Sequence, residues 1–568
     1  MRIGLGCMRL SADEDLASAT IGAAVEAGVT VFDTARAYGR GAEDLGGNEA
    51  LLARALHRCG ARGSARIVTK GGMTRAGGGW VPDGRAHAIR GDCEASLVAL
   101  DGLPIDLYLL HAPDPRTPWR TSVRALARLL DEGVVAHVGV ANVNRRQFDE
   151  ALDLAPITAV QVAINPFDGA AIRGGLVEYC TEKGIAVIAH SPLGGPRRAT
   201  GLARQRVLAD VATARGASPS EVALAWLLDL SPAVVGIPGA RRPETARSAA
   251  AAAGLHLEAG DREILARAFG GLRPARAPRR RSRPDADVVL LMGIPGAGKS
   301  RRADEFVARG YGRLNRDQRG GSLPDLAEAL DRELASGTAR VVLDNTWLTR
   351  AARSHAIEAA ARHRVPARCV WLDTPLAQAQ VNVVERLLER FGSLPTPEEL
   401  RALARREPRM LMPTSQMRAL RELEPPATDE GFAAVERVPF VRTPPSGDTR
   451  AGSFVAAAAL TRPDWQRVLE EGDRTAPHLV FEWQPNGTPA ELDACVASLA
   501  AEISGSVSGA LCPHAAGPPS CWCRPPLPGL PLAFARARAV DPARSVLIGT
   551  GPAHRTLAST LGARFVLV

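Results

Sequence analysis

Over the first 270 residues of this 568-residue chain, short apolar runs alternate with longer amphipathic stretches. The short runs have the length of strands and the longer stretches have the periodicity of helices, so the pattern predicts repeated strand–helix units. Eight such units close a parallel α/β barrel of the (β/α)8 TIM type, which we expect for residues 1–272. The predicted strands lie at residues 3–5, 30–32, 66–69, 105–110, 136–140, 159–162, 185–189 and 233–237.

Two further α/β segments follow the predicted barrel. The apolar run at 288–292 leads into a glycine-rich loop and then a helix, which predicts a P-loop NTPase-type α/β sandwich over residues 287–442. A smaller α/β domain is expected over residues 450–568. Its predicted strands are the apolar runs at 454–459, 478–481, 545–548 and 564–568.

The segment between the first two domains, residues 273–286, is rich in arginine and proline. Proline and like charges both disfavour packing, so we expect an extended linker. Its charge also suits a polyanion. The sequence leaves open whether the segment binds one or only separates the domains.

The composition is typical of a folded multidomain protein, with 46% hydrophobic and 23% charged residues and a formal net charge of +9. No uncharged apolar run reaches the ~18 residues of a membrane-spanning helix, and the N-terminus lacks the apolar segment of a signal peptide. Nine cysteines in a chain of this length do not form a disulfide scaffold. We therefore expect a cytoplasmic protein without a membrane partner.

Only three of the 70 lysine and arginine residues are lysines. Arginine replaces lysine as a simple positive charge, but not as an ammonium group that titrates or binds one oxygen as a point charge. Codon bias explains the scarcity of lysine, but not why Lys70 and Lys299 lie in candidate catalytic motifs. Lys183 follows a helical pattern and is expected to be an ordinary cation at a helix C-terminus.

Four polar residues lie at or after the predicted carboxyl ends of barrel strands, where the active sites of such barrels are found. They are Asp33, Tyr38, Lys70 and His111. Their chemistry suits the reduction of a carbonyl group, with Tyr38 donating a proton to the developing alkoxide and neutral His111 holding the carbonyl oxygen. The charge of Lys70 would lower the phenol pKa, and Asp33 would pair with that ammonium.

The order of these motifs, from Phe32-Asp-Thr-Ala-Arg-Ala-Tyr38 through Lys70 to Leu109-Leu-His111, resembles the aldo-keto reductases over nearly all of the 270 residues. The resemblance implies a small aldehyde or ketone substrate and NADPH bound across the barrel mouth. It also implies that an amide pair holds the nicotinamide carboxamide, that an aromatic residue stacks on the ring, and that cations at a helix start receive the 2′-phosphate. In this sequence the matching residues are Asn142 and Gln161, His190, and Gly239, Arg241 and Arg242.

The second domain opens with the phosphate-binding pattern Gly293-Ile-Pro-Gly-Ala-Gly-Lys-Ser300, in which Gly293, Gly296 and Gly298 allow the backbone to surround phosphates. Lys299 would contact the β- and γ-phosphates of ATP, and Ser300 would bind Mg²⁺. The pattern predicts nucleotide binding and leaves the phosphate acceptor open.

Two later motifs restrict the class of molecule that would accept the phosphate. Leu314-Asn-Arg-Asp317 and a strand ending in Asp344 resemble the 5′-hydroxyl polynucleotide kinases, above all the kinase module of polynucleotide kinase-phosphatases. The resemblance implies that Asp317 is the general base, that Asp344 helps to bind substrate or metal, and that Arg386 or Arg390 steadies the γ-phosphate. A nucleic-acid 5′-hydroxyl end is then the acceptor. A small-molecule kinase with the same core is the alternative.

The third domain contains four soft ligands within twelve residues: Cys512, His514, Cys521 and Cys523. Cys-x-His and Cys-x-Cys in a Pro/Gly-rich loop suit tetrahedral Zn²⁺ in a structural role. The stretch from Cys521 to Gly529 resembles the zinc loop of haloacid-dehalogenase (HAD)-type phosphatases. The Asp-x-Asp nucleophile of that family is not visible on any apolar strand, so we expect a HAD-like binding domain without phosphatase activity.

Together these patterns predict a bifunctional enzyme that combines NADPH-dependent carbonyl reduction with ATP-dependent phosphorylation of a hydroxyl group. Two alternatives remain open at the level of the sequence. A metabolic fusion would reduce and phosphorylate one small carbonyl compound, and a non-catalytic barrel would sense pyridine nucleotide and regulate the kinase.

Overall fold

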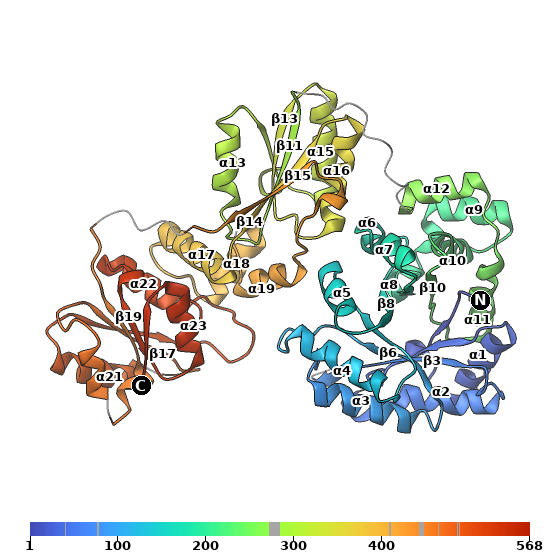
Figure 1. The fold of residues 1–568 in the computed structure, drawn as a ribbon, viewed down its shortest axis with the longest axis horizontal. Coiled ribbons are helices and arrows are strands. Elements are labelled where there is room, and N and C mark those ends of the chain that lie inside the picture. Colours follow the sequence, from blue (N-terminus) through green and yellow to red (C-terminus); the bar gives the residue numbers. More distant parts are fainter. Residues whose placement is uncertain are drawn as a thin grey trace. The chain divides into compact units, whose positions relative to one another are not determined.

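The structure is a computed structural model that describes residues 1–39, 41–76, 79–271, 285–407, 410–441, 448–463, 465–485, 487 and 489–568. Most of the predicted linker at 273–286 lies outside these residues. The chain divides into two compact units, one of Met1–Arg279 with Thr349–Ser354 and the other of Arg280–Leu348 with His355–Val568. The barrel lies in the first unit, and the two five-stranded sheets lie in the second (Figure 1).

The first sheet has eight strands, and all of its strand pairs are parallel (Figure 1). Parallel bridges between Ile3 and Gly236 and between Gly6 and Gly239 join its two ends, so the barrel predicted from the apolar runs is confirmed. In sheet order the strands are β1 (Leu5–Gly6), β2 (Val31–Asp33), β3 (Arg66–Gly71), β6 (Ile105–Leu110), β7 (Val138–Ala141), β8 (Ile157–Ala163), β9 (Ala186–His190) and β10 (Val234–Gly236).

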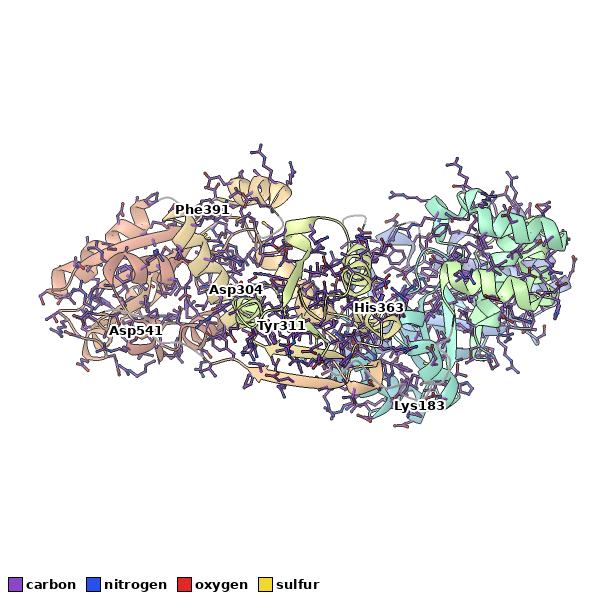
Figure 2. All side chains as sticks on the ribbon, turned by 90° about the horizontal axis from the view of Figure 1, so that it is seen from above. Lys183, Asp304, Tyr311, His363, Phe391 and Asp541 are labelled. Carbon is purple, nitrogen blue, oxygen red and sulfur yellow. The ribbon has the colours of Figure 1, made fainter. Side chains whose placement is uncertain are left out.

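Amphipathic helices between these strands pack on the barrel and bury their apolar faces in one core. The principal ones are α1 (Glu14–Glu26), α2 (Gly47–Arg58), α3 (Ala86–Ala99), α4 (Trp119–Asp131), α5 (Arg145–Leu152), α7 (Leu176–Lys183), α9 (Arg206–Arg215), α10 (Pro219–Asp229), α11 (Pro243–Ala251) and α12 (Ala259–Phe269). Lys183 is exposed in the last turn of α7, which confirms it as a helix-terminal cation (Figure 2). The sequence patterns did not predict the antiparallel hairpin of β4 (Met73–Ala76) and β5 (Gly79–Pro82).

The second sheet contains five parallel strands in the order β12-β13-β11-β14-β15. Their bounds are β11 (Asp287–Met292), β12 (Gly312–Asn315), β13 (Arg340–Asp344), β14 (Ala367–Asp373) and β15 (Ala434–Pro439). The helices that bear on the site are α13 (Lys299–Val307), α14 (Arg316–Arg319), α15 (Leu323–Ala335), α17 (Leu376–Phe391), α18 (Pro397–Arg406) and α19 (Pro413–Glu422). Strands β11 and β13 are direct neighbours, with Leu291 opposite Asp344, which brings the loop after β11 close to that carboxylate.

The third sheet also has five parallel strands, in the order β18-β17-β16-β19-β20. They are β16 (Ser453–Ala456), β17 (His478–Trp483), β18 (Val507–Cys512), β19 (Val546–Gly549) and β20 (Arg564–Leu567), with helices α20 (Ala457–Leu460), α21 (Pro489–Glu502), α22 (Gly529–Arg538) and α23 (Pro552–Leu561). The strand predicted at 454–459 is too long, because the alanines from Ala457 onward begin α20. Strand β18 escaped prediction because Ser508 and Gly509 interrupt its apolar run at the edge of the sheet.

In the described part of the chain, no helix is long and apolar enough to cross a membrane. This agrees with the absence of a long apolar run in the sequence.

Candidate active sites

The barrel brings the four predicted polar residues together at the carboxyl ends of its strands. Asp33 is the last residue of β2, Lys70 is the penultimate residue of β3, and His111 directly follows β6. Tyr38 lies in the loop after β2, and its ring centroid is 5.6 Å from that of His111. The register of the parallel strands therefore makes one site from residues spread over almost 80 positions.

Lys70 and Asp33 form a buried ion pair at the base of this site. The Lys70 ammonium donates to Asp33 Oδ1 at 2.7 Å and to the carbonyl of Thr34 at 2.8 Å, and the two charged side chains are 0% and 3% exposed. Burial disfavours the ammonium, but Asp33 and Tyr38 outweigh it and raise the pKa of Lys70 above its ordinary value. A charge held this firmly next to a phenol can act on the proton of that phenol.

The phenol of Tyr38 lies against this charge, with the Lys70 Nζ 4.8 Å from its ring centroid. Burial raises the pKa of Tyr38 above its ordinary value, and the opposing effect of Lys70 is smaller. The charge of Lys70 lowers the phenol pKa, as predicted, but the desolvation of the phenolate is the larger effect, so the net shift of the Tyr38 pKa is upward. Tyr38 keeps its proton at neutral pH, which is the state that a proton donor needs.

His111 is neutral in the structure, as carbonyl binding requires. Burial, the charge of Lys70 and the nearby His190 lower the pKa of His111 to about 3. Its Nδ1 is buried and has no hydrogen-bond partner among the described residues. An imidazole with an unused nitrogen beside the phenol of Tyr38 is suited to bind a substrate oxygen.

The pH dependence of reduction follows from these pKa shifts. His111 stays neutral down to about pH 4 and Tyr38 stays protonated to at least pH 9, so neither group changes state between pH 5 and 9. We expect the rate of hydride transfer, measured in single turnovers by loss of NADPH absorbance, to be flat over that range. A fall in rate below about pH 6.5 would show that His111 titrates with an ordinary pKa.

Two of the predicted cofactor residues contact each other beside the tetrad. Asn142, which adopts a positive φ of 56°, donates its amide to the carbonyl of His111 at 3.0 Å, and its Oδ1 lies 3.1 Å from His190 Nε2.

Gln161 donates its amide to Asp33 Oδ2 at 2.7 Å, so this side chain holds the carboxylate that pairs with Lys70. Its predicted bond to a nicotinamide carboxamide would use the remaining amide oxygen.

The remaining predicted cofactor residues lie together after β10. Gly239 bridges to Gly6 of β1, and Arg241 and Arg242 are exposed immediately before α11. Cations at the start of a helix, next to free backbone N–H groups, can bind a phosphate. Their placement fits the predicted contact with a 2′-phosphate.

Trp80, which the sequence patterns did not predict, lies beside the tetrad on the β4–β5 hairpin. Its ring centroid lies 5.9 Å from that of Tyr38 and 5.7 Å from that of His111, in edge-to-face geometry, and the residue is 40% exposed. A lone tryptophan directly after three glycines in the loop that follows Lys70 was the available signal. The three rings give the site an aromatic wall.

The loop between β11 and α13 borders a cavity of about 900 Å³ in the second unit. Its glycines have positive φ angles of 156° at Gly293, 88° at Gly296 and 93° at Gly298. A Cβ at Gly296 would lie 2.4 Å from the Ala379 carbonyl oxygen, so no larger residue fits there without movement of the backbone. The sequence pattern therefore forms the predicted phosphate-binding loop.

Lys299 turns its ammonium back onto this loop, donating to the carbonyls of Gly293 at 2.9 Å and Ile294 at 3.0 Å. Desolvation lowers the pKa of Lys299 to about 8, although the nearby Asp344 and Asp317 favour its charged form. A phosphate group is a stronger partner for an ammonium than two carbonyl oxygens. The residue is thus placed to exchange the loop carbonyls for a nucleotide phosphate.

Asp344 lies at the tip of β13, where it accepts hydrogen bonds from Ser300 Oγ at 3.3 Å and Asn315 Nδ2 at 2.8 Å. Hydroxyl and carboxylate oxygens are the ligands that Mg²⁺ prefers, so Ser300 and Asp344 fit the predicted metal role. Arg313, which the sequence analysis did not single out, also pairs with Asp344 and with Asp304. Arg313 of β12 therefore compensates the negative charge of Asp344 even without a metal ion.

Asp317 and Arg386 both line the cavity, on α14 and α17 respectively, whereas Arg390 does not. The Arg390 guanidinium pairs with Glu407 through two contacts of 2.7 and 3.0 Å. Of the two arginines that the sequence offered for the γ-phosphate, Arg386 is the one at the cavity. Asn382, one turn earlier on α17, was missed and donates to the loop carbonyl of Gly296 at 2.8 Å.

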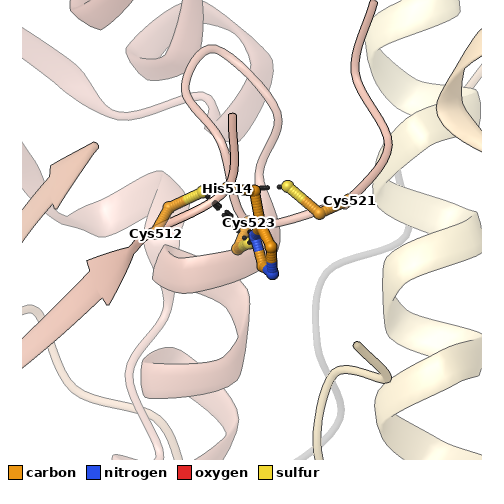
Figure 3. Close-up of side chains that lie close together, drawn as sticks. All are labelled: Cys512, His514, Cys521 and Cys523. Atoms are coloured by element: carbon orange, nitrogen blue, oxygen red, sulfur yellow. Dashed lines mark hydrogen bonds between the residues drawn. The ribbon is translucent and has the colours of Figure 1, made fainter. Parts of the chain in front are cut away.

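The four predicted metal ligands converge after β18, and their ligand atoms all lie within 4.8 Å of one another (Figure 3). Cys512 Sγ lies 3.3 Å from Cys523 Sγ and 3.7 Å from Cys521 Sγ, and His514 Nδ1 lies 3.2 Å from Cys523 Sγ. Zn–S bonds of about 2.3 Å in a tetrahedron place sulfur atoms roughly 3.8 Å apart. The cysteines are free thiols, so the cluster fits a tetrahedral metal ion better than a disulfide.

Metal analysis tests this cluster directly. Freshly purified protein is expected to carry about one Zn²⁺ per chain, and Cys521→Ser should lose it and lower the melting temperature of the C-terminal domain, because a missing ligand weakens binding that contributes to folding. Cys495→Ser, on α21 outside the cluster, is the control and should keep the metal. Wild-type protein purified without zinc would contradict the site.

Strands β16 and β19, which are neighbours inside the C-terminal sheet, are not followed by a carboxylate. Strand β16 is followed by Ala457 and Ala458, and β19 is followed by Thr550 and Gly551. A carboxylate nucleophile would be expected at the end of such a strand. This placement agrees with the expectation of a binding domain, which stays a prediction.

Comparison with known proteins matches the barrel and the P-loop domain to one protein family each. Residues 2–267 match the aldo/keto reductase family and residues 288–408 match a family described as AAA domain. An aldo/keto reductase from Klebsiella pneumoniae, solved in complex with NADP and acetate, is 27% identical with a TM-score of 0.41, covering 49% of this chain and 94% of that one.

Two sequence relatives each match less than half of this chain. An uncharacterized oxidoreductase of Schizosaccharomyces pombe is 31% identical over 266 residues, covering 45% of this chain and 82% of the relative. A probable aldo-keto reductase of Glycine max is 31% identical over 274 residues, covering 42% of this chain and 76% of the relative. Because each relative is 31% identical and the match spans most of its length, the chain belongs to the aldo/keto reductase family, and here the barrel is fused to a P-loop domain.

Proposed function

We propose that the barrel reduces a small aldehyde or ketone with NADPH. The observation that carries this proposal is the buried contact of Lys70 with Asp33 and Tyr38 beside neutral His111. NADPH, when bound, would supply hydride to the carbonyl carbon. The phenol of Tyr38 would give its proton to the carbonyl oxygen, and His111 would hold that oxygen while charge develops on it.

The residues that would hold the cofactor are present at the barrel mouth. Asn142 and His190 lie beside the tetrad, and Arg241 and Arg242 offer exposed cations at the start of α11. The test is consumption of NADPH with a panel of short aldehydes and ketones, followed at the absorbance of the reduced nicotinamide. A barrel that only senses pyridine nucleotide would bind NADPH but leave every carbonyl in the panel unreduced.

We also propose that the P-loop domain transfers the γ-phosphate of ATP to a hydroxyl group. Its support is one cavity that is lined by Lys299, Ser300, Asp344, Asp317 and Arg386, so that the proposed phosphate, metal and base positions share one space. Asp317 would accept the proton of the attacking hydroxyl, while Lys299 and Arg386 would stabilise charge on the transferred phosphoryl group.

A nucleic-acid 5′-hydroxyl end is the acceptor that we propose for this kinase. Arg301 and Arg316 also line the cavity, which gives it cations in addition to Lys299 and Arg386. Phosphate transfer from labelled ATP, tested on 5′-hydroxyl oligonucleotides beside a panel of sugars and alcohols, decides between the two acceptor classes. Binding of oligonucleotide should also weaken steeply with added salt.

A metabolic fusion is the second candidate, because the two proposed reactions share a functional group. Reduction of an aldehyde creates a primary hydroxyl, and the kinase consumes a hydroxyl. Phosphorylation of the barrel's own alcohol product, with 5′-hydroxyl oligonucleotides left unmodified, would favour this candidate.

A further inference from the structure

Helix α17 forms one wall of the nucleotide cavity. Gln378, Asn382 and Arg386 line the cavity from this helix and are spaced four residues apart, so they share one helical face. The hydrogen bond from Asn382 to the Gly296 carbonyl ties the same face to the phosphate-binding loop. The position of α17 therefore determines where Arg386 lies relative to a phosphate bound in that loop.

The other face of α17 is buried against the C-terminal domain. Val384, Leu387 and Leu388 are at most 2% exposed and belong to a hydrophobic core that this domain shares. A polar contact to the same domain comes from the cavity face, where Gln378 Nε2 donates to the Thr560 carbonyl at 3.1 Å. From the C-terminal domain the core contains the buried side chains of Trp522, Leu527, Leu532, Phe534, Leu557 and Leu561.

Because close-packed interiors transmit displacement instead of absorbing it, α17 cannot shift independently of the side chains packed on it. A P-loop domain without the C-terminal domain would expose an apolar face of the very helix that carries Arg386. The C-terminal domain thus supports the cavity from behind.

Trp522 links this support to the metal-ligand cluster. It lies between Cys521 and Cys523, is 1% exposed, and donates its indole N–H to the carbonyl of Leu411 at 3.0 Å. Leu411 itself lines the nucleotide cavity. A metal ion bound by the cysteines on both sides would fix the backbone of Trp522, and through it the segment that precedes α19.

We propose that the C-terminal domain completes the nucleotide site of the P-loop domain, with Trp522 as a positioning residue whose placement depends on the metal ion. This inference rests on the nucleotide and metal binding proposed above. It assigns a role to a domain in which strands β16 and β19 are followed by alanines and by threonine-glycine instead of carboxylates: that domain acts through packing.

A matched pair of tryptophan variants of the full chain tests the proposal. Trp522→Phe and Trp483→Phe each lose one indole hydrogen bond to a carbonyl, but that of Trp483 goes to His514 at 2.9 Å, inside the C-terminal domain. The readouts are zinc content, the dissociation constant of a fluorescent ATP analogue, and hydrogen–deuterium exchange of α17 and residues 410–412. Lys299→Ala serves as the reference for loss of the nucleotide site.

We expect Trp522→Phe to keep its zinc, to bind the analogue about 5-fold more weakly and to exchange faster in α17. Trp483→Phe, compared at equal zinc content, should bind within about 2-fold of wild type. Removal of zinc from wild-type protein by a chelator should weaken binding at least as much as Trp522→Phe, and added Zn²⁺ should restore it.

The outcomes separate this inference from the function on which it rests. Wild-type protein that fails to bind the analogue, or binds it no better than Lys299→Ala, would overturn the proposed nucleotide binding itself. A second possible result is that wild type, Trp522→Phe and zinc-free protein all bind the analogue equally tightly and show the same exchange in α17. That result would overturn the proposal that the C-terminal domain supports the nucleotide site. Equal weakening in zinc-loaded Trp483→Phe would overturn the specific role of Trp522.

Discussion

Tyr38→Phe is expected to lower the turnover number for aldehyde reduction by roughly 10²- to 10⁴-fold, the range for loss of a general acid. The variant removes only the phenolic oxygen, so Lys70 and Asp33 keep their ion pair at 2.7 Å and the aromatic contacts with His111 and Trp80 remain. The phenol acts in the transition state, so NADPH affinity should stay close to that of wild type. Steady-state kinetics and fluorescence titration with NADPH measure the two quantities separately.

Tyr179→Phe is the control, because Tyr179 lies on α7 and packs against Arg145 with the guanidinium 3.3 Å from the ring centroid. It should leave turnover unchanged, which shows that loss of a phenol elsewhere in the barrel has no general effect. Reduction by Tyr38→Phe at the wild-type rate would remove the proton-donor role from this residue. It would also leave the buried charge of Lys70 without a proposed function.

The barrel and its tetrad were predictable from the sequence because both depend on local patterns. Strand β2 ends in Asp33 and β3 nearly ends in Lys70, and parallel strands bring such ends to one rim whatever the lengths of the helices between them. The pKa of Tyr38 was not predictable in the same way. Its direction depends on the balance of burial against the nearby ammonium, and the extent of burial is a property of the packed structure.

Contacts between distant segments account for most of what the sequence did not reveal. Trp80 reaches the site through a hairpin whose strands are only four residues each, too short for a periodic signal. No motif in the sequence distinguishes Arg313 from the other arginines. Its ion pair with Asp344 depends on the pairing of β12 with β13. Arg386 and Arg390 are four residues apart on α17, so the sequence alone did not show which of them reaches the γ-phosphate position. The structure places Arg386 at the cavity and pairs Arg390 with Glu407.

The metal-ligand cluster was predictable from a local motif, whereas the long-range contact of Trp522 was not. Four soft ligands within twelve residues form a local signal, and the structure brings them together as predicted. Trp522 lies within that motif, yet its hydrogen bond crosses 111 positions to Leu411. The motif predicted a ligand set, while the partner of the residue between the ligands emerged only from the fold.

Lys299→Ala and Asp317→Ala are expected to abolish phosphoryl transfer for different reasons. Loss of Lys299 removes the ammonium that would neutralise the phosphates, so both ATP binding and transfer should fall, with transfer lowered by roughly 10²- to 10³-fold. Loss of Asp317 removes only the acceptor of the hydroxyl proton, so ATP binding should stay near wild type while transfer falls about 10²- to 10⁴-fold. Binding of a fluorescent ATP analogue and transfer of labelled phosphate distinguish the two effects.

Two variants provide matched controls for this pair. Lys183→Ala removes an exposed lysine at the end of α7, and Asp331→Ala removes a carboxylate of α15 that pairs with Arg362 and His363 outside the cavity. Neither should change transfer by more than about 2-fold, since surface ion pairs contribute little. If Asp317→Ala phosphorylates 5′-hydroxyl ends as fast as wild type, the base lies elsewhere and the likeness to polynucleotide kinases fails. If wild type ignores such ends but phosphorylates a sugar or alcohol, the cavity arginines serve a small acceptor and the two domains act on related small molecules.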